Sequence, residues 1–108
     1  ILEKPLIFIL TLVLLVILYT YFMSRIDDII DEMKTNPANI RFTDLCKVCD
    51  YYFGKHRQRG SSHRIYKTPW KADPRINIQN NKGKAKVYQV KQVLIALDKL
   101  EENYDIKK

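Results

Sequence analysis

The chain has 108 residues, with 19 Lys and Arg against 12 Asp and Glu, so its formal net charge is +7. A chain of this length accommodates one small domain, which excludes Rossmann enzymes, (β/α)8 barrels and kinases. Two cysteines and three glycines exclude a disulfide-built scaffold and a low-complexity chain.

The positive charge is concentrated in the middle of the sequence. Lys55–Lys91 contain eleven basic residues and one acidic residue, Asp73. Charge localised in this way indicates a polyanionic partner, such as a nucleic acid, more firmly than a high overall charge does.

Residues 1–22 form an apolar segment ahead of the charged part of the chain. Leu6–Phe22 is almost wholly apolar and is just long enough to cross a bilayer, which takes roughly 17–25 residues. Tyr19 and Tyr21 would suit the aromatic layer of a membrane interface. Two interpretations remain open. The segment is either a transmembrane anchor or upstream translation outside the native protein, which would then begin at Met23 and be cytoplasmic.

Residues 23–40 predict a short amphipathic helix and a linker. Ser24 is a suitable N-cap, and Asn36-Pro37 predicts the end of the helix. Apolar residues recur between them at helical spacing, namely Ile26, Ile29, Ile30 and Met33. We therefore expect a helix over 24–34.

Residues 41–103 predict an α+β domain, and residues 104–108 are expected to form a tail. A broad apolar stripe predicts a helix over 43–53, with Thr43 as N-cap and Gly54 as the stop signal. Three strands and a closing helix follow, with expected bounds 55–59, 63–68, 75–79 and 87–103.

The connections between these elements are rich in turn-forming residues. Gly60–Ser62 predicts a hairpin turn, Pro69–Pro74 a longer connection and Asn80–Gly83 another turn. Strict alternation places Ile76 and Ile78 toward the core. A three-stranded antiparallel sheet with helices on one face would leave its other face open to a ligand.

The order α-β-β-β-α with basic strands resembles the double-stranded-RNA-binding-domain-like fold. Arg57–Lys67 (RQRGSSHRIYK) resembles the signature of HicA-family mRNA interferase toxins, in which a Gly/Ser turn precedes a His that opens a strand. Asp73–Ile78 and Lys84–Val93 resemble the third strand and closing helix of that family. The resemblance covers roughly residues 42–100. This sequence departs from the common form in having two serines between Gly60 and His63.

The resemblance implies an endoribonuclease that cleaves mRNA without metal or cofactor, and an acidic HicB-type antitoxin as its protein partner. It also implies that His63 is catalytic. An imidazole can move the proton of a ribose 2′-OH while Lys and Arg stabilise phosphate charge. The plain alternative is a surface His that bonds to backbone in a turn. The expected RNA-binding residues are Arg57, Arg59, Ser62, Arg64, Lys67, Trp70, Lys84 and Lys86.

Other residues that could take part in binding or catalysis also have purely structural interpretations. His56 is a conceivable second acid/base group across the turn from His63, although a solvent-facing position is favoured. Cys46 and Cys49 lie on the apolar stripe, which favours two small buried side chains over a zinc or redox pair. Trp70 either stacks on RNA bases or caps the core.

Two further function classes remain open beside the ribonuclease. One is a non-catalytic RNA-binding module with the same basic face. The other is an interaction protein anchored in a membrane through residues 6–22.

Overall fold

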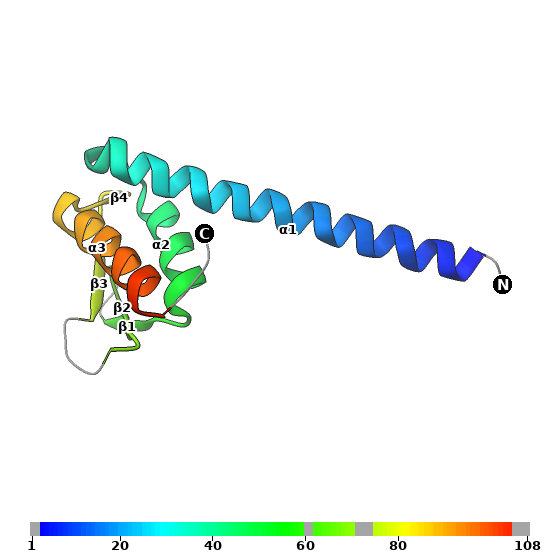
Figure 1. The fold of residues 1–108 in the computed structure, drawn as a ribbon. Coiled ribbons are helices and arrows are strands. Elements are labelled where there is room, and N and C mark those ends of the chain that lie inside the picture. The colour runs from blue at the N-terminus through cyan, green and yellow to red at the C-terminus, as the bar shows by residue number, and fades with distance from the viewer. Residues whose placement is uncertain (1–2, 60–61, 71–74, 105–108) are drawn as a thin grey trace.

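The computed structural model describes residues 3–59, 62–70 and 75–104. These ranges contain three α-helices, a short 3-10 helix and an antiparallel sheet, which confirms the predicted α+β class (Figure 1). In chain order the elements are α1 (Glu3–Thr35), η1 (Pro37–Asn39), α2 (Phe42–Phe53), β1 (Arg57–Arg59), β2 (His63–Tyr66), β3 (Ile76–Asn81), β4 (Lys84–Ala85) and α3 (Val87–Tyr104).

The sheet has the strand order β1-β2-β3-β4, and each strand is antiparallel to its neighbours. The three predicted strands are present, but the short fourth strand was not predicted. Part of the turn expected at 80–83 belongs to β3, and only Lys82 and Gly83 form the turn into β4. Both have positive φ, 54° and 88°, as two-residue hairpins of the primed turn types require.

α1 is longer than the sequence predicted. The expected helix over 24–34 is the second half of one continuous helix, so Ser24 lies in its interior and is not an N-cap. Extending an existing helix adds a hydrogen bond per residue without a new nucleation step. With no Gly or Pro between Pro5 and Pro37, nothing interrupts that extension. The end of the helix at Thr35, just before Asn36-Pro37, confirms the predicted stop.

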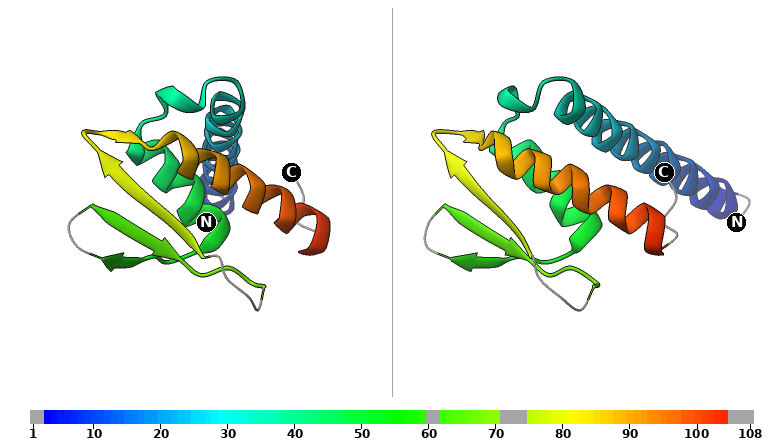
Figure 2. Two further views of the ribbon diagram at one scale, coloured as in Figure 1. Left: turned by 90° about the vertical axis from the view of Figure 1, so that its left-hand side faces the viewer. Right: turned by 60° about the vertical axis from the view of Figure 1, so that its left-hand side comes forward.

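A single core joins this helix to the rest of the domain. The expected boundary at residue 41 does not separate two units, because Ile26 and Met33 of α1 are completely buried together with Leu45 of α2. The sheet and α3 contribute further fully buried side chains, namely Tyr66, Ile78, Val90 and Val93. Figure 2 shows α2 and α3 on the same side of the strands, and the burial of Ile76 and Ile78 confirms their predicted core position.

α2 ends as predicted but begins differently. Gly54 has φ 80°, and its N–H donates to the carbonyl oxygen of Asp50 at 3.2 Å. The predicted N-cap Thr43 is wrong, because the helix begins at Phe42 and Arg41 occupies the cap position without a side-chain cap bond. Cys46 and Cys49 are buried on the core side of α2, which confirms their interpretation as small buried side chains. Burial raises the pKa of Cys46 to about 11.

The first half of α1 extends away from the domain (Figure 1). The large apolar side chains of Leu6–Phe22 are 44–73% exposed. Within the described residues, α1 is the one helix long and apolar enough to cross a membrane.

Candidate nucleic-acid interface

The register of the sheet separates its residues onto two faces, because directly paired residues of antiparallel strands lie on the same side. Arg64 pairs with Ile78 and Tyr66 pairs with Ile76, so these residues belong to the side covered by helices. His63 and its alternating neighbours belong to the opposite side. We call that side the open face; its described side chains are Arg57, His63, Ile65, Asn77, Gln79, Asn81 and Lys84.

None of these open-face side chains is buried. Arg57, Asn77 and Lys84 are exposed, and His63 is partly exposed. Among the described residues, the sheet therefore presents a largely polar face that is accessible to solvent, as the sequence predicted for one of its faces.

His63 lies in an inner strand of this surface. Its backbone pairs with Arg59 of β1 on one side and with Gln79 of β3 on the other. An imidazole at this position can meet a ligand that lies across the strands.

A buried glutamine supports β3 beside His63. β4 ends at Ala85, opposite Asn80, so the N–H of Gln79 has no strand partner at that edge. The side-chain oxygen of Gln89 accepts this N–H at 2.8 Å, and Gln89 is only 3% exposed. α3 thus satisfies a backbone group that the short fourth strand leaves free.

The electrostatic character of the open face is cationic and amide-rich. No residue of the four described strands is acidic, whereas β1 has the sequence Arg-Gln-Arg and β4 begins with Lys84. Guanidinium and ammonium groups bind phosphate oxygens, and amides pair with base edges or 2′-hydroxyls.

Arg64 has a different environment from the other predicted RNA-binding residues. Its guanidinium Nη1 lies 3.6 Å from Oδ2 of Asp50, and its Cζ lies 5.9 Å from the ring centre of Phe42. A hydrogen bond with Tyr66 raises the pKa of Arg64. Arg64 therefore links β2 to α2 on the helix-covered side and does not belong to the open face.

His56 lies with this same cluster and apart from His63. Its Nδ1 is 4.0 Å from Oδ1 of Asp50, and its ring centre is 5.7 Å from that of Tyr66. The Tyr66 hydroxyl donates to Oδ1 of Asp50 at 2.6 Å. The side chain of His56 is 27% exposed, so it faces solvent only in part. The two histidines do not face one another.

The remaining predicted residues lie around the edges of the sheet. Lys67 is exposed beyond β2, and Lys86 is half-buried between β4 and α3. Ser62 is half-buried, and its carbonyl oxygen accepts the N–H of Asn80 at 2.9 Å. Trp70 packs against the core with Lys99 Nζ 4.3 Å from its ring centre, which favours the core-capping interpretation. The side chain of Arg59, Gly60, Ser61 and residues 71–74 lie outside what the structure describes.

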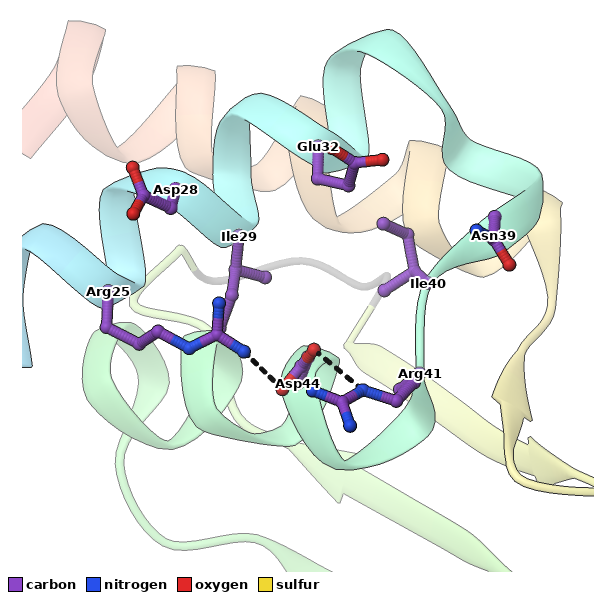
Figure 3. A pocket seen from close by; sticks show the side chains of 8 residues that line it. All are labelled: Arg25, Asp28, Ile29, Glu32, Asn39, Ile40, Arg41 and Asp44. Carbon is purple, nitrogen blue, oxygen red and sulfur yellow. Dashed lines mark hydrogen bonds and ion pairs between the residues drawn. The ribbon is translucent and has the colours of Figure 1, made fainter.

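A separate pocket of about 460 Å³ lies between α1 and the start of α2 (Figure 3). Asp44 is its central charge, 3.6 Å from Arg25 and 3.2 Å from Arg41. Opposite charges are already paired there, which fits an ion cluster that joins two helices. Across the described ranges, no group of three or more His, Cys, Asp or Glu residues is arranged to hold a metal ion.

Sequence reasoning missed the amides of β3, namely Asn77, Gln79 and Asn81. The signal was available, since the alternation that buries Ile76 and Ile78 places the intervening residues on the other face. What the pattern could not supply was the register that brings Gln79 beside His63.

Comparison with known proteins found no matching family model, no matching curated protein and no matching solved structure.

Proposed function

We propose that the chain is an mRNA-cleaving toxin of the HicA type, with a double-stranded-RNA-binding-domain-like fold and His63 as general acid/base. The main support is the position of His63 on an uncovered sheet face that is cationic and free of carboxylates over the described strands. The motif around Arg57–Lys67 and the order α2-β1-β2-β3-β4-α3, in which the short β4 is an addition to the expected order, support the same proposal.

The proposed reaction is attack of a ribose 2′-oxygen on the adjacent phosphorus. The His63 imidazole takes the 2′-OH proton as the O2′–P bond forms, and the P–O5′ bond breaks as the protonated imidazole returns this proton to the leaving 5′-oxygen. The products are a 2′,3′-cyclic phosphate and a 5′-hydroxyl. Arg57 and Lys84 would stabilise the phosphate charge, together with Arg59, whose backbone is paired with His63. His63 and these cations carry out the proposed steps without a metal ion or cofactor.

The surface also suggests how substrate and inhibitor would bind. Asn77 and Gln79 would contact ribose hydroxyls or the edges of unpaired bases. An acidic antitoxin of the HicB type would compete for the same cations, and opposite charge would accelerate that encounter.

The test is incubation of the full chain with a long unstructured RNA in EDTA. We expect cleavage by the wild type and by His56→Ala, and none by His63→Ala. His56→Ala is the matched control because it removes the other imidazole, which lies beside Asp50 on the covered side of the sheet. RNA binding by all three proteins without cleavage would instead favour a non-catalytic RNA-binding module.

The second proposal concerns location. The continuous exposure of Leu6–Phe22 favours a membrane anchor, with the RNA-cleaving domain on the cytoplasmic side where mRNA occurs. A membrane-anchored interaction protein without ribonuclease activity shares this anchor. Fractionation of cells that express the full chain tests the anchor, because an unanchored domain stays in the soluble cytoplasmic fraction.

A further inference from the structure

We propose that the folded domain rests directly against the lipid bilayer crossed by α1, with Tyr51 of α2 in the interfacial layer. This inference builds on the proposed membrane anchor and is independent of ribonuclease activity. It assigns a bilayer-facing surface to the domain itself and not only to the helix ahead of it.

The apolar half of α1 has the properties of a helix surrounded by lipid. Pro5–Ser24 has 20 residues without a charge, which in a helix cover about 30 Å, the thickness of a hydrocarbon core. Its apolar side chains are exposed around the whole circumference. A helix that is apolar on all sides suits lipid, whereas a partner protein would cover one stripe and leave the rest in water.

No linker separates this segment from the domain. Phe22 is still 44% exposed, whereas Ile26 is already completely buried in the core. The two residues are one helical turn apart, about 6 Å along the axis. That distance is comparable to the depth of one headgroup layer, roughly 5–7 Å, so the domain cannot remain far from the bilayer surface.

Aromatic side chains of α1 and of the folded domain lie close together at the level of Phe22. The rings of Phe22 and Tyr51 have centres 6.1 Å apart, and Tyr51 packs edge-on against Tyr52 at 4.9 Å. A side-chain hydrogen bond with Tyr19 raises the pKa of Tyr51. Tyr51 is 41% exposed. Tyrosines with an apolar ring and a polar tip are enriched at membrane interfaces, and here one of them belongs to the folded domain.

The same arrangement leaves the open face of the sheet accessible. In Figure 1 the apolar half of α1 extends past α2 and away from the strands. The bilayer therefore contacts the end of α2 that carries Tyr51, and β2, the strand that contains His63, lies away from it.

The test uses the full chain in vesicles of phosphatidylcholine and phosphatidylglycerol. An environment-sensitive fluorophore is attached to a cysteine introduced by Tyr51→Cys or, as the matched control, by Tyr88→Cys at an exposed position of α3. The native thiols, Cys46 and Cys49, are buried with raised pKa values and react far more slowly. Flotation reports the anchor, and a quencher on the lipid headgroup reports the depth of each fluorophore.

We expect both variants to float, with blue-shifted and quenched emission at position 51 and unquenched emission at position 88. Flotation with neither position quenched would overturn the contact between domain and bilayer while leaving the anchor intact. Equal quenching at both positions would also overturn it, because the contact would have no defined surface. A chain that stays in the aqueous fraction as an oligomer would overturn the anchor and the inference together, since a second copy would then cover the apolar helix.

Discussion

Substitution of two different pairs of cationic residues distinguishes phosphate binding from an effect of the overall net charge. Arg57 and Lys84 are exposed on the open face, whereas Lys34 and Lys47 lie on α1 and α2. We expect the double variant Arg57→Gln/Lys84→Gln to bind single-stranded RNA more weakly and with a flatter salt dependence. Each phosphate contact contributes about 0.7 to the slope of log affinity against log salt. Losing two contacts therefore reduces the slope by about 1.4, and affinity between 50 and 200 mM salt should fall about sevenfold less than in the wild type.

The assay is fluorescence anisotropy with a labelled single-stranded RNA, titrated at several salt concentrations in a His63→Ala background to prevent cleavage. The matched control, Lys34→Gln/Lys47→Gln, has the same net charge as the first double variant and should keep the wild-type slope within about 0.3. Equal slopes for the two double variants would refute the claim that the open face contacts phosphate.

The structure makes three further predictions about stability, each measurable by urea denaturation. Gln89→Leu leaves the Gln79 N–H unpaired and should cost about 1–3 kcal/mol; an unchanged midpoint would contradict that role. Tyr66→Phe removes the hydrogen bond to Asp50 and should cost about 1 kcal/mol, and no loss would mean that water replaces this bond fully. Burial raises the pKa of the Cys46 thiol from 9.0 to about 11. The contribution of the neutral thiol to the free energy of unfolding is therefore complete below pH 9 and is lost as the pH rises toward 11. Relative to Cys46→Ala, the free energy of unfolding of the wild type should fall by about 2–3 kcal/mol over that pH range. If the stability of both proteins changed with pH in the same way, the raised pKa of Cys46 would be contradicted.

Local patterns predicted most of the elements. The apolar stripe of 43–53 with Gly54 behind it, and the stripe of 87–103, gave helices within one residue of α2 and α3. Alternation in 75–79 identified β3 and the inward direction of Ile76 and Ile78. These successes share a cause, since each pattern is set by burial on one side of a single element.

The errors concern interactions between elements. Ser24 has a cap-like sequence context, but helix propagation from the apolar segment overrides it. Arg64 looks like the other cations of the basic block until its pairing with Ile78 places it on the covered side beside Asp50. Strand register decides the face of every residue, and the sequence between β2 and β3 does not specify that register.

The most direct test of the central claim is the identity of the RNA ends produced in EDTA. The wild type should yield fragments with 2′,3′-cyclic phosphate and 5′-hydroxyl ends, and His63→Ala should yield none, because the imidazole moves the 2′-OH proton. Fragments with 3′-hydroxyl and 5′-phosphate ends would contradict this account, since they require attack by water. Undiminished cleavage by His63→Ala would likewise show that the catalytic group lies elsewhere.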